Sequence, residues 1–309
     1  MTKKISIVFL FLLFSTFGYS AARSLAFPDL RGSAAAGNAP SKRLEQIPKR
    51  IVSLAPSITE ILFLLNLTDR VVGVTQYCIY LPEATSKTII GGYSNPNYES
   101  IYALRPDLVV LLTEHKEEKR QIEKLGLTCL TLDHQTIPAI MTSIKTLGRV
   151  CGKETAAVQI VRDLTKRMSR IENRTAGKGR PRTLVCIGGY MQSDGIESVT
   201  IAGGNTFYDN LIRCAGGVNA YQGAGAYPII SREGLIRLNP EVILIMESEM
   251  AKKDIDRTAI KKEWTDIPQL EAVRSGQIHV FGQSYVVIPG PRFILILEEM
   301  AAVIHPGME

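Results

Sequence analysis

The sequence is poor in the residue patterns that most enzymes, metal sites and redox centres require. It has four histidines and five cysteines in 309 residues, and no two cysteines form a CxxC pair, which excludes the usual zinc and redox motifs. It also lacks a GxSxG elbow, an HExxH helix, a lysine-containing phosphate loop and a dinucleotide fingerprint. We therefore expect no catalytic residue, no bound metal and no cofactor.

The excess of basic over acidic residues is also small. The formal net charge is only +6, from 36 basic and 30 acidic residues, and the basic residues are scattered along the chain. Such a weak excess argues against a nucleic-acid partner. Asp194, Glu247 and Glu249 could form a small acidic site, but they have no nucleophile or metal partner in the sequence.

The hydrophobic run at the N-terminus is too short for a membrane-spanning helix. Residues 1–22 place two lysines before about a dozen apolar residues and then small residues, as in a secretory signal peptide. A membrane span needs about twenty apolar residues. Residues 23–48 are rich in Ala, Gly, Ser and Pro, which predicts a flexible linker. We expect export to the periplasm and cleavage of the signal, after which the cysteines could form one or two disulfides or stay as buried thiols.

From residue 49 onward, short β-rich runs alternate with amphipathic helical stretches, which predicts an α/β fold with parallel sheets. The pattern occurs twice, in an N-terminal lobe (49–152) and a C-terminal lobe (177–309). Glu99 in "YESIYALRPDLVVLL" and Glu233 in "SREGLIRLNPEVILIM" each begin a short helix followed by a proline and a buried strand, at an offset of 134 residues (233 − 99). We therefore expect two Rossmann-like lobes that repeat one topology.

Residues 153–176 predict one long helix between the lobes. Apolar residues recur at helical spacing over about twenty residues, or roughly 30 Å. They are Ala157, Ile160, Val161, Leu164, Met168 and Ile171. A stiff connection of this kind predicts small motions between the unloaded and loaded states.

Two local signals add detail to the predicted elements. Ser57 and Glu60 stand in the S-x-x-E arrangement, which predicts a capping box at the start of a helix. Residues 260–276, "IKKEWTDIPQLEAVRSG", are interpreted as a single helix before the last strand.

The order of lobe, single helix and lobe resembles the helix-backbone class of substrate-binding proteins of ABC importers. The segments "NYESIYALRPDLVV", "SREGLIRLNPEVIL", "TFYDNLIRCAGGVN" and "WTDIPQLEAVRSGQIHVF" carry the resemblance, which covers residues 50 to 305. These receptors capture vitamin B12, ferric siderophores or haem. In this family one glutamate per lobe contacts arginines of the two membrane subunits, which implies docking roles for Glu99 and Glu233. A helix-dipole role for both acids is the alternative.

Ligands of open parallel sheets bind beyond the carboxyl ends of the strands, so the loops there are candidates for the binding site. Tyrosines recur on these loops, and a phenol ring offers stacking area and one hydroxyl partner. The candidates are Tyr77, Tyr93, Tyr190, Tyr227 and Tyr285. Ser284, on the loop after the last strand, is a further candidate. The chain departs from the cobalamin receptors in this loop, because it has Ser284 and Ile288 where the resemblance implies an acidic and a basic ligand contact.

The resemblance therefore implies a monomeric receptor that delivers cobalamin or a related corrinoid to an ABC permease dimer. A ferric siderophore would require cations in the cleft, for which the loops offer only Lys116 and Arg292. Haem would require a tyrosine or histidine ligand, and His115 lies beside "KEEKR", which predicts a solvated helix face. A ligand sensor and an enzyme on the same fold are the alternatives of another class.

Overall fold

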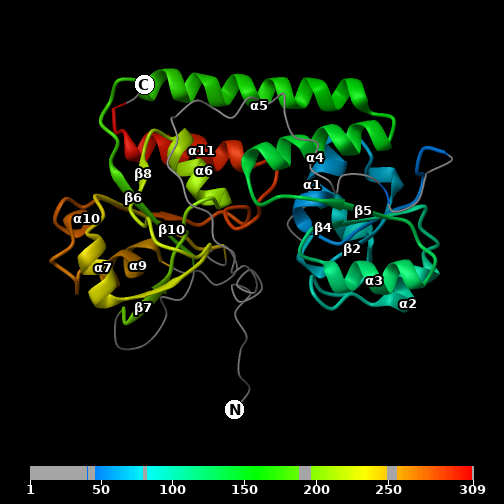
Figure 1. Cartoon of the computed structure of the whole chain (residues 1–309), viewed down its shortest axis with the longest axis horizontal. Helices are drawn as coiled ribbons and strands as arrows, with labels where there is room; N and C mark the ends of the chain where they lie inside the picture. Colours follow the sequence, from blue (N-terminus) through cyan, green and yellow to red (C-terminus); the bar gives the residue numbers. More distant parts are fainter. Residues whose placement is uncertain (1–39, 41–45, 79–81, 188–195, 249–255, 308–309) are drawn as a thin grey trace, which may run out of the picture. The chain divides into compact units, whose positions relative to one another are not determined.

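The computed structural model describes residues 40, 46–78, 82–187, 196–248 and 256–307 (Figure 1). The chain divides into two compact units. The N unit contains the described residues up to Thr165 together with Ile288–Pro291. The C unit contains Lys166–Val287 and the residues from Arg292 onward. The predicted signal peptide and most of the predicted linker lie outside the described residues, and the boundaries expected for the lobes stay predictions.

The N unit is built on a five-stranded parallel sheet in the order β3-β2-β1-β4-β5. Every residue of the neighbouring strands β1 and β4 is buried, which explains their continuous apolar runs. The strands are β1 (Ile51–Ser53), β2 (Val71–Val74), β3 (Thr88–Ile89), β4 (Leu108–Leu112) and β5 (Cys129–Leu132). The helices are α1 (Pro56–Leu64), α2 (Tyr98–Ala103), α3 (Lys116–Lys124) and α4 (Ile137–Val150), with short 3-10 turns at Thr68–Arg70, Gln76–Cys78 and Pro82–Ser86.

The C unit has a four-stranded parallel sheet in the order β11-β10-β6-β8 and a small antiparallel pair, β7-β9. The strands are β6 (Arg182–Ile187), β7 (Ser198–Thr200), β8 (Val218–Asn219), β9 (Ile229–Ser231), β10 (Val242–Met246) and β11 (Ile278–Phe281). The helices are α6 (Phe207–Cys214), α7 (Arg232–Leu238), α9 (Arg257–Trp264), α10 (Glu271–Arg274) and α11 (Phe293–Ile304). The prediction of an α/β fold with parallel sheets is confirmed.

The long helix expected between the two halves is α5 (Glu154–Thr175), within which the chain passes from the N unit to the C unit. Gly152 separates it from α4 and has a φ of +68°, a conformation that glycine adopts without steric cost. Of the six apolar residues that define the helical period, Ile160 is half-buried and the others are buried: Ala157, Val161, Leu164, Met168 and Ile171. The prediction of one continuous connecting helix is confirmed.

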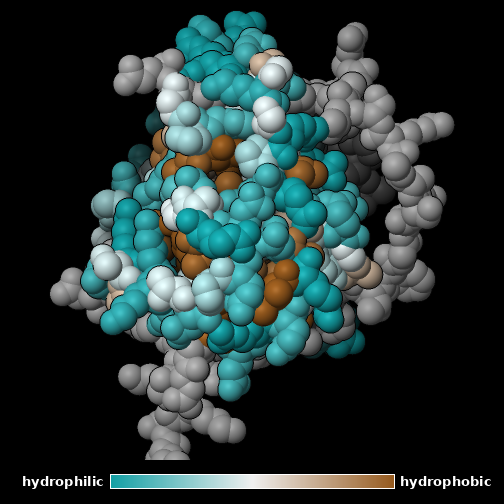
Figure 2. Space-filling model, turned by 90° about the vertical axis from the view of Figure 1, so that its left-hand side faces the viewer, coloured by the Kyte–Doolittle hydropathy of each residue, from teal (hydrophilic) through white to brown (hydrophobic). Residues whose placement is uncertain are grey.

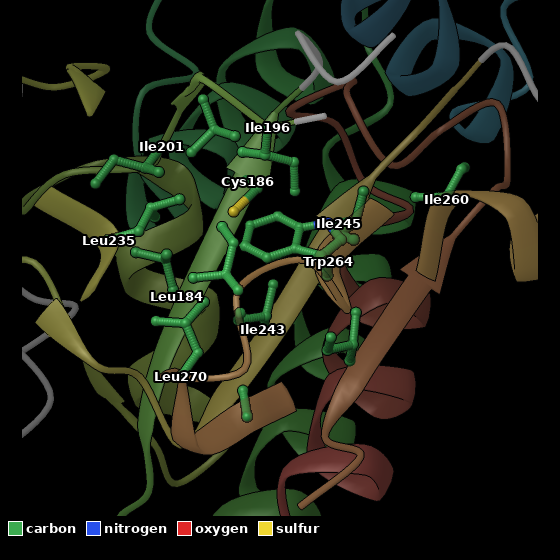
Figure 3. Packing of buried hydrophobic residues seen from close by; sticks show 14 of the residues in the cluster. Leu184, Cys186, Ile196, Ile201, Leu235, Ile243, Ile245, Ile260, Trp264 and Leu270 are labelled. Atoms are coloured by element: carbon green, nitrogen blue, oxygen red, sulfur yellow. The ribbon is translucent and has the colours of Figure 1, made fainter. Parts of the chain in front are cut away.

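Each unit has its own hydrophobic core. In the C unit the fully buried Trp264 packs beside Cys186 and Ile245, between side chains of β6 and β10 (Figure 3). In the N unit the core comprises Val52, Leu54, Ile90, Ile101, Val109, Leu111, Ile122 and Cys129. Two separate cores agree with the domain size that one hydrophobic core supports.

Two local predictions are wrong. Helix α1 begins at Pro56 with Ala55 as N-cap, so Ser57 lies inside the first turn and no capping box forms. Residues 260–276 form two helices rather than one, since α9 ends at Trp264 and α10 begins at Glu271. Pro268 lies between them, where its missing N–H and its ring interrupt a continuous helix.

The internal repeat extends to individual hydrogen bonds. In the N unit, Arg50 donates from its side chain to the carbonyl of Leu104 at the end of α2, and its backbone N–H donates to Asp107 Oδ2 at 2.8 Å. In the C unit, Arg182 donates to the carbonyl of Leu238 at the end of α7, and its backbone N–H donates to Glu241. We call these two groups the strand-entry anchors.

All five cysteines are present as thiols, and none forms a disulfide. Four are buried and Cys214 is half-buried. The first of the two sequence alternatives, one or two disulfides, is therefore wrong.

Candidate functional site

The N unit has a topological switch point between β1 and β4, from which the chain continues to opposite edges of the sheet. In parallel sheets this point, at the carboxyl ends of the strands, is where ligands bind. Tyr77 follows β2, Tyr93 follows β3, Glu114 and His115 follow β4, and His134 follows β5. The structure therefore places the predicted Tyr77 and Tyr93 on the same edge of one sheet.

Tyr93 is held in one orientation by a carboxylate. Its side chain is buried, and its hydroxyl donates a hydrogen bond of 2.5 Å to Glu114 Oε1. The other carboxylate oxygen of Glu114 accepts a bond of 3.3 Å from Thr113 Oγ1. Burial and the negative charge of Glu114 both raise the pKa of Tyr93, so the phenol is neutral. Glu114 lies on a loop that the sequence marked, but no motif distinguished it from its neighbours.

His115 is buried, so the expectation of a solvated position is wrong. Its Nδ1 accepts a hydrogen bond of 3.0 Å from the backbone N–H of Leu112, which places the proton of the neutral ring on Nε2. Its ring centroid lies 4.3 Å from that of Tyr93. Burial lowers the pKa of His115 to about 4. The histidine therefore fixes the turn after β4 and packs against the ring of Tyr93. Its Nδ1 is not available to a ligand.

A second polar contact lies beneath this edge. His134 Nδ1 and Ser57 Oγ are 2.8 Å apart, and both residues are buried. Burial lowers the pKa of His134 to about 3. Gly290 packs against this region so closely that a Cβ would lie 3.0 Å from Glu60 Oε2 and 3.3 Å from Ser57 Cβ. Ser57, which the sequence assigned to a helix cap, instead fixes a buried histidine.

In the C unit the described candidates lie on two loops. Tyr227 is half-buried on the segment between β8 and β9, and Ser284 and Tyr285 are half-buried after β11. The guanidinium carbon of Arg292 lies 4.7 Å from the centre of the Tyr285 ring, in cation–π geometry. Tyr190, Asp194 and Glu249 lie outside the described residues. Glu247 follows β10 and is half-buried.

The two predicted docking acids lie in different units, and both are exposed. Glu99 is in the first turn of α2, where Asn97 caps the helix by accepting from the Ser100 N–H at 2.8 Å. Glu233 is in the first turn of α7 and accepts a bond of 2.8 Å from Ser231 Oγ. That bond lowers the pKa of Glu233. Both carboxylates therefore have the exposure that contact with a partner requires.

Three further observations restrict the kinds of site that the described residues could form. Among the described residues, no group of three or more histidine, cysteine and acidic side chains could hold a metal ion. Nor does the described part of the chain contain a helix with the length and apolarity that crossing a bilayer requires. The face drawn in Figure 2 is mostly hydrophilic, with hydrophobic residues appearing as separate spots.

Comparison with known proteins agrees with this architecture. An uncharacterized ABC transporter substrate-binding lipoprotein, YvrC of Bacillus subtilis, is 28% identical over 272 residues, or 85% of this chain and 82% of the relative. A cobalamin-binding protein of Halobacterium salinarum is 27% identical over 271 residues, or 85% and 71% of the two chains. A periplasmic heme binding protein from Pseudomonas aeruginosa matches with a TM-score of 0.72 and 24% identity, covering 85% of this chain and 95% of that one.

The paired sheets and the connecting helix thus define a two-lobed substrate-binding fold. Residues 51–285 match the periplasmic binding protein family, and the chain belongs to that family. The resemblance to the helix-backbone class of substrate-binding proteins is confirmed. The binding and docking residues stay predictions.

Proposed function

We propose that the protein is an exported, monomeric receptor that captures cobalamin or a related corrinoid and delivers it to an ABC permease dimer. Family membership and the cobalamin-binding relative support this ligand class. The observation that carries the proposal is the neutral phenol of Tyr93, held beside Glu114 at the switch point of the N unit. A corrinoid is a bulky macrocycle with amide edges, which phenol rings can contact without a charge partner.

The charges beside the candidate residues of each unit disfavour an anionic iron chelate. Glu114 puts a carboxylate beside Tyr93, while Lys116 is exposed at the start of α3 and Arg292 covers the Tyr285 ring. A ferric siderophore with negative charge would require arginines or lysines directed at the ligand. The described loops therefore suit a neutral or cationic chelate better.

Haem is the second candidate, and one contact favours it. A tyrosine oxygen can ligate haem iron, and the carboxylate of Glu114 is placed to accept the phenol proton of Tyr93 at 2.5 Å. The structural relative from Pseudomonas aeruginosa is a heme binding protein. His115 does not serve in this role, because its Nδ1 accepts from the Leu112 N–H, the ring proton is therefore on Nε2, and the ring is buried.

The ligand is tested by titrating the purified mature chain with cyanocobalamin, cobinamide, haem and a panel of ferric siderophores. Trp264 and tyrosine fluorescence reports binding. We expect tight corrinoid binding that Tyr93→Phe and Glu114→Gln weaken, whereas Tyr102→Phe, an exposed phenol on α2, leaves it unchanged. Tight binding of an iron chelate with no corrinoid binding would overturn the ligand assignment.

Delivery to a permease depends on Glu99 and Glu233. The two acids head equivalent helices of a repeated chain, so they could contact equivalent cations on a twofold partner. Each exposed ion pair contributes only about 0–1 kcal/mol, so the pair selects orientation more than it supplies affinity. Reversing both charges should therefore abolish uptake and leave ligand affinity intact.

The uptake experiment has a charge-matched control. Glu83 and Glu271 are also exposed acids, and Glu271 likewise lies in the first turn of a helix. We expect the double reversal Glu83→Arg with Glu271→Arg to support uptake. Equal loss in both double variants, or lost ligand affinity in the Glu99 and Glu233 pair, would refute the docking role. Ligand binding without uptake in a strain that has the permease would instead favour a sensor, and turnover of the ligand would indicate an enzyme.

A further inference from the structure

The loop after β11, which bears Ser284 and Tyr285, is attached to the rest of the C unit by three separate side-chain contacts. Gln283 Nε2 donates to Glu299 Oε2 on α11 at 3.0 Å. Arg292 lies over the ring of Tyr285. The third contact comes from α6, where the hydroxyl of Tyr208 donates to the carbonyl of Val286 at 2.7 Å.

Tyr208 is well suited to fix this loop. It is the second residue of α6, it is 4% exposed, and its ring meets Phe207 edge-to-face with centroids 5.2 Å apart. Helix α6 in turn packs against α11. Val286 is fully buried. If the Tyr208 hydroxyl were removed, the Val286 carbonyl would lose this donor and could not replace it with bulk water. The phenol therefore joins a rigid helix to the main chain of the loop.

The other candidate ligand loop of the C unit has its own attachment. The segment that carries Tyr227 is held by Gly203, whose N–H donates to the carbonyl of Ala226 at 2.7 Å. A Cβ at Gly203 would lie 2.0 Å from the carbonyl oxygen of Gly225, so the two segments are in direct backbone contact.

We infer that Tyr208 is a positioning residue that holds the loop after β11 in its binding conformation without itself contacting the ligand. This inference rests on the proposed function, because Ser284 and Tyr285 are ligand residues only if that function is correct. Loops that already have their bound conformation lower the entropic cost of ordering on binding. Losing this pre-organisation should weaken binding mainly through faster dissociation.

Tyr208→Phe tests the inference, because it keeps the ring and its packing and removes only the hydroxyl. Tyr102→Phe is the control, since it removes an exposed phenol on α2 of the N unit, outside both candidate ligand loops of the C unit. Hydrogen exchange of the apo protein and stopped-flow binding of cyanocobalamin are measured for both variants and the wild type.

We expect Tyr208→Phe to speed exchange selectively in peptides spanning residues 283–288 and to weaken binding by about tenfold, mostly through faster dissociation. Tyr102→Phe should change neither quantity by more than about twofold. Unchanged exchange in 283–288, or faster exchange throughout the C unit, would overturn the positioning role. If the wild type binds neither cyanocobalamin nor haem, the proposed ligand class fails, and the exchange result alone decides whether Tyr208 holds the loop.

Discussion

At the residue scale, Tyr93 and Glu114 illustrate what the sequence could and could not predict. Loop position was sufficient to nominate Tyr93, because it lies on a loop between predicted elements where tyrosines recur. Its partner Glu114 is 21 residues away along the chain, and no local pattern joins the two. Ser57 shows the opposite error, since a local capping pattern was present but Pro56 starts the helix and the hydroxyl pairs with His134.

The buried histidines make stability sensitive to acid. Burial lowers the folded-state pKa of His134 to about 3 and that of His115 to about 4, from 6.5. The unfolded chain therefore binds more protons below pH 6.5, and the free energy of unfolding falls as the pH falls toward these values. Between pH 7.5 and 5 we expect each histidine to cost of order 1–2 kcal/mol. Urea unfolding at the two pH values measures this loss.

An independent measurement distinguishes the histidines from other titrating groups. Ring proton resonances of His115 and His134 should show no titration between pH 8 and 5.5 in the folded protein. Titration of either ring near its ordinary value, or equal unfolding free energies at pH 7.5 and 5, would contradict the assignment of both as buried neutral groups.

The thiols should be unreactive in the native state. Burial raises the pKa of Cys151 to about 11 and that of Cys129 and Cys214 to about 12, and it raises that of Cys78 as well. A thiol reacts as its thiolate, so none of these groups supplies a nucleophile at neutral pH. Ellman's reagent should react slowly with the folded chain and rapidly with all five cysteines in denaturant. Rapid reaction of one thiol in buffer would show that its site opens to solvent.

At the element scale, the strand-entry anchors show that the repeat preserves interactions as well as pattern. Asp107 Oδ2 accepts from the backbone N–H of Lys49 at 2.7 Å and of Arg50 at 2.8 Å, and Glu241 accepts from Arg182. The helices before them also end alike, since Arg105 and Asn239 both have positive φ. Residues 134 positions apart therefore share backbone conformation and accept equivalent hydrogen bonds in the two units.

We expect the two strand-entry anchors to contribute similar amounts to the free energy of unfolding. Asp107→Ala and Glu241→Ala each remove a charged acceptor from the start of a central strand, which should lower the free energy of unfolding by about 1 kcal/mol. Urea denaturation measures the change. Glu83→Ala, at an exposed acid in the 3-10 turn Pro82–Ser86 and outside both anchors, should change it by less than half as much. Equal losses in all three variants would contradict the role of the anchors.

Elements that the sequence missed are those with too few residues to show a period. Strands β3 and β8 have two residues each, so their place in a sheet is set by pairing with β2 and β6 rather than by their own pattern. The antiparallel pair β7-β9 depends on contacts between residues about thirty apart. The role of Tyr208 could not be predicted from the sequence, because only the folded loop reveals which carbonyl its hydroxyl contacts.

At the scale of the whole molecule, the chain forms two separately packed units. It passes from the first to the second within one long helix, α5. Length, repeat and helical period were sufficient to predict this organisation, because each depends on many residues rather than on one contact. The 22-residue helix α5 has no proline and no glycine in its interior to act as a kink.

A stiff connection predicts a small change on loading. Labels on cysteines introduced at Lys119 in the N unit and Lys262 in the C unit should report nearly the same distance with and without cyanocobalamin. Pulsed electron paramagnetic resonance measures that distance. As a control, a Gly-Gly substitution at Arg162 and Asp163 in α5 should broaden the distribution, and a shift of many ångströms in the unmodified helix would contradict the prediction.

The burial of four native thiols, together with the raised pKa of the half-buried Cys214, gives such experiments a practical basis. Maleimide reagents should find only the cysteines placed deliberately on the surface, so the natural ones need not be replaced before a dye or spin probe is attached. A fluorophore beside the loop after β11 would then convert the protein into a sensor for its own ligand, and could identify that ligand in a crude extract before any transport assay exists.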